Sequence, residues 1–253
     1  MFPKLLHIHG PVWIHGYGLM VAVGFLVFIY FLYNNPERKK IINNETLFNT
    51  LFLGLISGVI GSRLITVIYE WESFSKNICQ IFYPWVGGYG MLGAIIGVLI
   101  TVPIYLKIKK VPILKLFDLV AIYAGLLEGV SRIGCFLAGC CHGFPTNCFL
   151  SVTFTNPDGL APLNVALHPT QIYSSIASFA VFIFMYFRSK YFKHKTGELL
   201  FTFLALSSFF RFTIDFLRGD RDFIFGNLFS YSQFIAFFIF IFSLIGFIIV
   251  RKK

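Results

Sequence analysis

The first apolar segment of the chain, residues 17–33, reads YGLMVAVGFLVFIYFLY and contains no charged residue. A polar, charged turn, NNPERKK (residues 34–40), follows it directly and is typical of the end of a helix. About 17–25 predominantly apolar residues carry an α-helix across a bilayer, so the segment predicts a membrane-spanning helix.

Six further apolar segments follow, so the sequence predicts an all-α integral membrane protein with seven transmembrane helices. These form one polytopic domain, residues 1–253. The predicted spans are residues 17–33, 46–69, 87–106, 114–134, 170–187, 198–217 and 230–250. Residues 135–169 form the longest external loop and contain no Lys or Arg.

The composition of the chain supports this class of protein. Of the 253 residues, 57% are hydrophobic and 13% are charged, against roughly 45–50% and 25% in soluble domains. The mean hydropathy is +0.77. These values exclude a disordered chain, a nucleic-acid-binding domain and an ordinary cytosolic enzyme.

The 21 Lys and Arg residues indicate the orientation in the membrane. Fourteen of them lie on one side: three in the first connection, four in the third, four in the fifth and three at the C-terminus. Cytoplasmic loops carry the excess of Lys and Arg, so the C-terminus is predicted in the cytoplasm and the N-terminus outside. The net charge of +10 therefore reflects topology and does not indicate a nucleic-acid partner.

Three arginines, Arg63, Arg132 and Arg211, fall inside predicted spans, in the half of the membrane nearer the outside. Ionisable residues within a bilayer usually face a cavity or a partner because exposing them to lipid is costly. The guanidinium group suits an anionic cluster of oxygens such as phosphate. The arginines therefore predict a cavity, open toward the outer leaflet, that holds a phospholipid head group.

The sixth predicted span has polar residues spaced by four, four and three: Ser207, Arg211, Asp215 and Arg218. This spacing places them on one face of a helix. Glu128 lies one turn from Arg132, so both helices contain a possible ion pair. The alternative is that these are buried ion pairs that only fix helix packing.

Three motifs carry a resemblance to a known family. They are SRIGCFLAGCCHGFPT (residues 131–146), HPTQIY (residues 168–173) and RFTIDFLRGD (residues 211–220). In this order on seven spans, the chain resembles the bacterial prolipoprotein diacylglyceryl transferase family over essentially its whole length. Shorter matches are YGL at residues 17–19, GSR at 61–63 and SQ at 232–233.

The resemblance implies a transferase of the bacterial cytoplasmic (inner) membrane whose active site faces the outer leaflet and periplasm. It implies transfer of a diacylglyceryl group from phosphatidylglycerol to the lipobox cysteine thiol of prolipoproteins, with release of glycerol phosphate. Phosphatidylglycerol and prolipoprotein signal peptides are the implied partners, and no cofactor or metal is implied. Arg132 and Arg211 match the essential arginines, and further matching positions are Tyr17, Arg63, Gly143, His168, Gln171, Asp215, Arg218 and Gln233.

The chain departs from the family pattern at four positions. Leu92 stands where the His-Gly-Gly signature has its histidine. Cys135 replaces an asparagine, Cys140 replaces an acidic residue, and Ser207 replaces a tyrosine. Two other interpretations therefore stay open: a related phospholipid-headgroup transferase with a different acceptor, and a non-catalytic lipid-binding or transport protein.

The implied chemistry needs positive charge at the leaving phosphate and a base for the thiol. Arg132 and Arg211 are the candidates for the first requirement, with Arg63 or Arg218 in support. Since Leu92 cannot accept a proton, His142 is the first candidate for the base and His168 the second. The alternatives are a surface histidine at His142 and a packing histidine at His168.

All five cysteines, Cys79, Cys135, Cys140, Cys141 and Cys148, fall on or near the predicted outer side, where disulfides can form. The sequence leaves open a disulfide within the external loop or from that loop to Cys79. The spacing is not a recognisable zinc pattern, so no metal site is predicted.

Overall fold

The structure is a computed structural model that describes residues 2–9, 12–75, 77–82, 90–221, 223–224 and 229–252. The chain divides into two compact units. The first unit contains residues 1–34 and 117–253, and the second contains residues 35–116.

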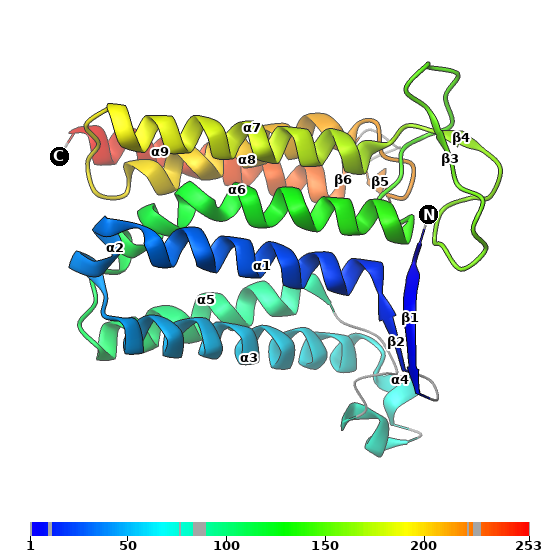
Figure 1. Ribbon diagram of the computed structural model, residues 1–253, viewed down its shortest axis with the longest axis horizontal. Coiled ribbons are helices and arrows are strands. Elements are labelled where there is room, and N and C mark those ends of the chain that lie inside the picture. Colours follow the sequence, from blue (N-terminus) through cyan, green and yellow to red (C-terminus); the bar gives the residue numbers. More distant parts are fainter. Residues whose placement is uncertain are drawn as a thin grey trace. The chain divides into compact units, whose positions relative to one another are not determined.

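The first unit is a helical bundle built from α1 (Gly16–Asn34), α6 (Ile113–Ala138, from Phe117 onward), α7 (Thr170–Tyr191), α8 (Glu198–Asp215) and α9 (Tyr231–Lys252). Helix α8 packs against both α7 and α9, and these helices run alongside one another (Figure 1). Glycines allow the close approaches. A Cβ atom at Gly125 of α6 would lie 2.6 Å from the Ser178 carbonyl oxygen of α7, and one at Gly134 would lie 3.2 Å from the Cα of Tyr17 in α1.

Within the described residues, three two-stranded antiparallel sheets belong to the first unit. They pair β1 (Lys4–His9) with β2 (Val12–His15), β3 (Val152–Thr153) with β4 (Ala166–Leu167), and β5 (Phe223–Ile224) with β6 (Phe229–Ser230). Figure 1 shows all three at the same end of this bundle, opposite the C-terminal end of α9. A small apolar core of Phe154, Ala161 and Leu167 orders the long loop after α6.

Helix α8 is fixed to α6 at the end far from these sheets. The carboxylate of Asp118 in α6 is buried and accepts hydrogen bonds from the backbone amides of Gly197 and Leu200. These amides belong to the first turn of α8, where backbone donors have no partner within the helix. Asp118 thereby caps α8 from a neighbouring helix and fixes the position of one helix against the other.

The second unit contains α2 (Pro36–Ile41), α3 (Asn44–Tyr69), the short helices α4 (Trp71–Phe74) and η1 (Ile78–Phe82), and α5 (Met91–Ile108). Helices α3 and α5 pack along their length. Their contact depends on facing glycines, because a Cβ atom at Gly93 would lie 2.1 Å from the carbonyl oxygen of Gly61. Such small residues let membrane helices approach closely.

We expect Gly93→Ala to destabilise the second unit by about 1–3 kcal/mol, because the added methyl group forces the backbones of α3 and α5 apart. Thermal unfolding in detergent measures the loss. Gly54→Ala is the matched control, since its Cβ would meet only Val102 Cγ2 at 3.6 Å. Equal unfolding temperatures for the two variants would contradict the close packing.

The structure places a helix of at least eighteen residues at each predicted span. Residues 87–89, where the third span was predicted to start, lie outside the described residues. Among the described helices, four are long and apolar enough to cross a membrane: α1, α3, α7 and α9. Helix α8 instead carries Glu198, Arg211 and Asp215 within its eighteen residues. The chain is thus a multi-pass membrane protein.

Candidate active site

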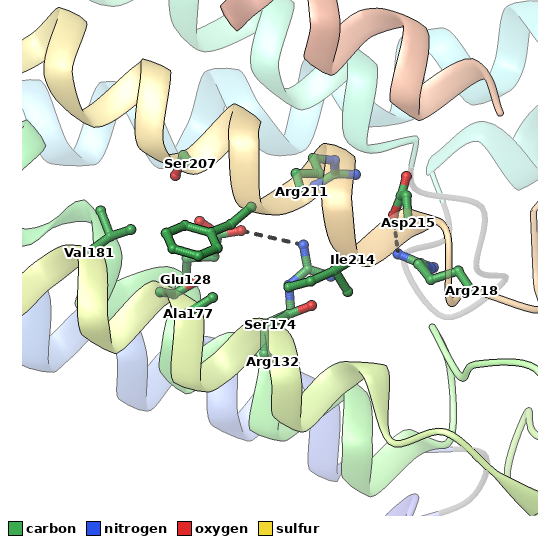
Figure 2. A pocket seen from close by; sticks show the side chains of 12 residues that line it. Glu128, Arg132, Ser174, Ala177, Val181, Ser207, Arg211, Ile214, Asp215 and Arg218 are labelled. Atoms are coloured by element: carbon green, nitrogen blue, oxygen red, sulfur yellow. Dashed lines mark hydrogen bonds and ion pairs between the residues drawn. The ribbon is translucent and has the colours of Figure 1, made fainter. Parts of the chain in front are cut away.

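A polar cavity lies between α6, α7 and α8 of the first unit (Figure 2). It encloses about 370 Å³ of empty space, including its open mouth. Charged and small polar side chains line it together with apolar ones: Glu128, Arg132, Ser174, Ala177, Ser178, Val181, Ser207, Phe210, Arg211, Ile214, Asp215 and Arg218. Ser207, Arg211 and Asp215 share a face of α8 as predicted, whereas Arg218 lines the cavity from the turn that follows the end of α8 at Asp215.

Arg132 reaches the cavity from α6, and its side chain is only 14% exposed. One guanidinium nitrogen, Nη2, lies 3.4 Å from Oε1 of Glu128, one turn earlier on the same helix. The other, Nη1, lies 4.0 Å from Sγ of Cys141. Arg132 therefore stands between a carboxylate in the cavity and a thiol in the loop that follows α6.

Arg211 enters the same cavity from α8, and Figure 2 shows its guanidinium group near those of Arg132 and Arg218. Within the described part of the chain, Arg211 has neither a hydrogen-bond partner nor an ion-pair partner. A half-buried guanidinium group without a partner is costly unless an anion binds it. Arg211 is thus the cavity cation most available to an anionic ligand.

Arg218 is held in an ion network just beyond α8. Its Nε and Nη2 atoms donate to the two carboxylate oxygens of Asp220 at 2.9 and 2.8 Å. Its Nη1 atom lies 3.8 Å from Asp215, whose carboxylate is almost fully buried. The Asp215 carboxylate also accepts a hydrogen bond from Ser232 and lies 3.7 Å from Nε of Arg221. Arg218 therefore contributes a fixed positive charge.

The surroundings of Arg218 shift the pKa of its guanidinium group. Burial lowers the pKa of Arg218, but the hydrogen bonds to Asp220 and the charges of Cys141 and Asp215 raise it, and the net shift is upward. The group is therefore a permanent cation at this end of the cavity.

Away from Arg218, Ala177 and Val181 of α7 and Ser207 and Phe210 of α8 line the cavity. A cavity with arginines at one end and apolar side chains along its length suits an amphiphile with an anionic head group. The α7 wall was not predicted from the sequence, although its residues follow the spacing of one helix face: Ser174, Ala177, Ser178 and Val181.

The loop after α6 is held in an unusual backbone conformation beside the cavity. Gly139 and Cys141 have positive φ angles of 76° and 61°. Gln171 Nε2 donates to the carbonyl oxygen of Cys140 at 2.7 Å, and Thr170 Oγ1 donates to that of Cys141 at 2.6 Å. The first residues of α7 thus fix this turn, and a left-handed residue other than glycine is typical of strained functional sites.

Gly143 sits where this loop meets two other segments. Its amide donates to the His168 carbonyl at 2.9 Å, and it forms an isolated bridge with Arg218. A Cβ atom there would lie 2.5 Å from Cβ of His168 and 2.7 Å from the Leu217 carbonyl oxygen. Only glycine fits, so Gly143 positions the segment that carries Arg218.

We expect Gly143→Ala to displace this segment and to destabilise the protein by about 1–3 kcal/mol, because the methyl group overlaps backbone atoms on two sides. Thermal unfolding measures the loss. Gly18→Ala is the control, since a Cβ atom at Gly18 meets nothing within 4 Å. An unfolding temperature of Gly143→Ala equal to that of the control would refute the role given to this glycine.

Neither predicted histidine base lines the cavity. Nδ1 of His142 lies 3.2 Å from the carbonyl oxygen of Gly143, and Nδ1 of His168 lies 3.4 Å from the hydroxyl of Tyr173. Both residues flank the Gly143 junction through backbone hydrogen bonds. Their catalytic roles stay predictions, whereas Glu128, the predicted partner of Arg132, does line the cavity.

Other predicted site residues do not line this cavity. Arg63 belongs to the second unit, where its guanidinium group donates to the carbonyl oxygens of Ile81 and Gln80 at 3.0 and 2.6 Å. Gln233 accepts from the Ser230 amide at 2.8 Å, while Ser230 Oγ accepts from the Gln233 amide at 3.2 Å. That reciprocal pair is a capping box at the start of α9. Tyr17 lies in the first turn of α1 and is 46% exposed.

Leu92, which replaces the family histidine, lies in α5 of the second unit and is 53% exposed. This departure from the family pattern therefore places an apolar side chain on the surface of α5.

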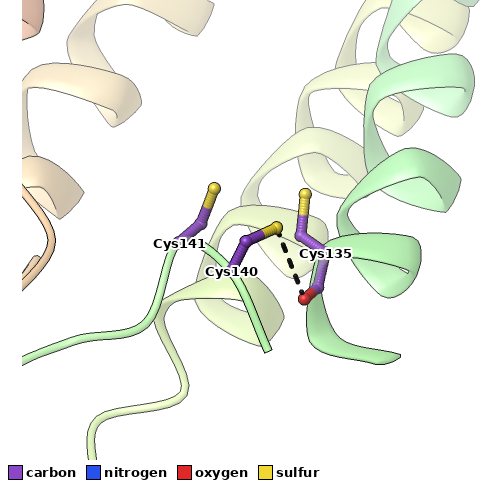
Figure 3. Close-up of side chains that lie close together, drawn as sticks. All are labelled: Cys135, Cys140 and Cys141. Atoms are coloured by element: carbon purple, nitrogen blue, oxygen red, sulfur yellow. Dashed lines mark hydrogen bonds between the residues drawn. The ribbon is translucent and has the colours of Figure 1, made fainter. Parts of the chain in front are cut away.

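All five cysteines are free thiols, so no disulfide forms in the external loop or to Cys79. Three of them, Cys135, Cys140 and Cys141, gather at the end of α6 (Figure 3). Hydrogen bonding with Cys135 and Cys140 lowers the pKa of the Cys141 thiol, and the charges of Arg218 and Arg132 act in the same direction. Hydrogen bonding with Cys135 and Cys141 raises the pKa of the Cys140 thiol.

The fold and the cavity together define a multi-pass membrane protein with an arginine-lined pocket suited to an anionic amphiphile. The model of the prolipoprotein diacylglyceryl transferase family matches residues 3–249 of the chain. The chain belongs to this family.

Relatives in several bacteria are similar over most of their length. A phosphatidylglycerol–prolipoprotein diacylglyceryl transferase of Clostridium tetani is 38% identical, over all of this chain and 99% of the relative. A second enzyme of that name from Clostridium perfringens is 37% identical over 90% of this chain and 88% of its own. One from Dehalococcoides mccartyi is 31% identical over 86% and 82%.

Proposed function

We propose that this protein transfers a diacylglyceryl group from phosphatidylglycerol to the cysteine thiol of a prolipoprotein lipobox. The names of its relatives support both substrates. One observation carries the proposal at the level of the site: Arg211 faces the cavity beside Arg132 without an ion-pair partner among the described residues. An anionic phosphate would supply that partner.

In the proposed reaction, the thiolate sulfur of the acceptor attacks a glyceryl carbon of the lipid. A carbon–sulfur bond forms, the bond from that carbon to the phosphate oxygen breaks, and glycerol phosphate leaves with both electrons of the broken bond. Negative charge grows on the leaving phosphate, where Arg132 and Arg211 stabilise it most in the transition state. Arg218, held by Asp215 and Asp220, adds positive charge at the same end.

The thiol proton must pass to a base, because the thiolate is the nucleophile. We propose His142 or His168 for this role, as the loop around Gly143 places both next to the Arg218 segment. Glu128 competes with them, since its carboxylate lines the cavity and is 35% exposed.

The base is expected to contribute about 10²–10⁴-fold to the rate. Three variants compare the candidates: His142→Gln, His168→Gln and Glu128→Gln, each assayed across a range of pH. The true base should show the large loss together with a changed pH profile. Normal rates and profiles for both histidine variants would exclude the histidines.

Tyr17, Gly143, Gln171 and Gln233 complete the proposed substrate-binding set of the first unit. Arg63 is a separate proposed substrate-binding residue of the second unit. Gln171 and Gly143 act by fixing the loop beside the cavity. Gln233 acts by fixing the start of α9, which carries the Ser232 hydroxyl that donates to Asp215.

We also propose that seven helices cross the inner membrane, with the N-terminus outside, the C-terminus in the cytoplasm and the cavity open to the outer leaflet. The distribution of Lys and Arg supports this topology. The placement of the strands and of the C-terminal end of α9 at opposite ends of the first unit supports it too (Figure 1).

The test uses purified protein in vesicles that contain phosphatidylglycerol, with a lipobox peptide whose only thiol is the acceptor cysteine. Mass spectrometry should detect the added diacylglyceryl group, together with released glycerol phosphate. Vesicles of phosphatidylethanolamine alone should give no product. An intact, lipid-loaded protein that leaves the peptide unmodified would overturn the proposal.

A second candidate function follows from Leu92, which cannot serve as the histidine of the family signature. In that case, the same arginine cavity would serve a phospholipid-headgroup transferase with another acceptor. A screen of lipid products after incubation with phosphatidylglycerol and non-peptide acceptors separates the two, because the second candidate forms a product without the peptide.

A further inference from the structure

The thiols of Cys135, Cys140 and Cys141 form a cluster that the transferase reaction does not use. Their sulfur atoms all lie within 4.8 Å of one another. Cys135 is 6% exposed, and the other two are half-buried. Figure 3 shows the three side chains together, with Cys140 Sγ donating to the carbonyl oxygen of Cys135 at 3.7 Å.

The separation of the sulfurs fits a metal ion at their centre. Metal–sulfur bonds of about 2.3 Å in a trigonal plane place the sulfurs about 4.0 Å apart. Side-chain rotations of the three cysteines close the remaining difference from 4.8 Å. Among the described residues, no His, Asp, Glu or further Cys belongs to this group. Three thiolates without a fourth protein ligand favour a soft ion over zinc, which is almost always four-coordinate in structural sites.

The backbone that presents the cluster is fixed before any ion arrives. Cys135 lies on the last turns of α6, whereas Cys140 and Cys141 lie in the turn that α7 holds through Gln171 and Thr170. Cys141 has a positive φ, and its sulfur lies near that of Cys135 on α6 (Figure 3). Two segments are therefore locked so that their sulfurs converge, which reduces the entropy cost of binding.

The charge around the cluster suits an anionic complex. Three thiolates and one monovalent cation carry a net charge of −2. The guanidinium group of Arg132 lies 4.0 Å from the sulfur of Cys141 and offsets part of that charge. Arg218, which lines the same cavity as Arg132, contributes another fixed positive charge.

We propose that Cys135, Cys140 and Cys141 form a three-coordinate thiolate site for monovalent copper. Binding releases the thiol protons to solvent and changes no oxidation state. The site adjoins the arginine cavity through the contact between Cys141 and Arg132.

The test titrates the full-length, reduced protein in detergent with monovalent copper under anaerobic conditions, in competition with a colorimetric chelator of that ion. We expect one copper per wild-type chain. Cys135→Ser and Cys141→Ser should each lose this copper, whereas Cys148→Ser should keep it. Cys148 is the matched control because it is half-buried in the same external loop but lies outside the cluster.

X-ray absorption at the copper edge of the wild-type protein should show three sulfur neighbours, and this readout does not depend on how the variants fold. A parallel titration with zinc should show weaker binding than copper. The proposal is overturned if wild-type protein binds no copper, if Cys135→Ser binds it as well as wild type, or if zinc binds more tightly.

Discussion

Arg211→Ala should lower the rate of diacylglyceryl transfer by about 10²–10³-fold, the loss typical of removing one group that stabilises developing negative charge. Arg211 projects into the cavity from α8 without an ion-pair partner among the described residues, so its charge is available to a phosphate. The rate with a lipobox peptide in phosphatidylglycerol vesicles measures the effect.

Two further variants test the cause of the lower transfer rate in Arg211→Ala. Arg211→Lys should recover only part of the rate, because an ammonium group keeps the charge but lacks the planar pair of donors. Arg251→Ala removes an exposed arginine at the end of α9 and should leave the rate unchanged. If Arg211→Ala is folded and as active as Arg251→Ala, the phosphate does not bind at Arg211.

Asp215→Asn should destabilise the protein by about 3–5 kcal/mol, the usual consequence of breaking a buried ion pair from one side. The Asp215 carboxylate is 2% exposed and lies near both Arg218 and Arg221. Its loss leaves the positive charges of these arginines less compensated beside the cavity. Thermal or denaturant unfolding in detergent measures the change.

The exposed pair between Asp158 and Lys4 is the control for this prediction. Its atoms are 2.8 Å apart, but the side chains are 48% and 38% exposed. Surface pairs of this kind contribute about 0–1 kcal/mol, so Asp158→Asn should change little. Equal losses for the two variants would contradict the structural importance given to the Asp215 network.

The sequence predicted the helices well, because apolar length and polar turns are local signals. Residues 17–33 and 46–69 lie within α1 and α3 to within a few residues. The shared face of Ser207, Arg211 and Asp215 followed from helical spacing alone. It is harder to predict from the sequence which helices cross the membrane. The charged residues that line the cavity also make a helix such as α8 less apolar.

The contacts that hold the predicted site residues join distant segments, and these contacts were not predicted from the sequence. Arg63 has the same residue type and predicted depth as Arg132, yet its hydrogen bonds go to backbone carbonyls near η1. Gln233 belongs to a capping box whose pattern, Ser230 followed three residues later by glutamine, is visible in the sequence. The thiol cluster could not be predicted, because a positive φ at Cys141 brings together sulfurs from a helix and a loop.

The proposed mechanism requires the phosphate of phosphatidylglycerol to bind between Arg132 and Arg211. A crystal structure of the protein grown from a lipid phase containing phosphatidylglycerol tests this binding mode. We expect a phosphate in the cavity between α6, α7 and α8, with oxygens about 2.7–2.9 Å from both guanidinium groups. A bound phosphatidylglycerol whose phosphate lies elsewhere, with Arg211 facing an empty cavity, would contradict it.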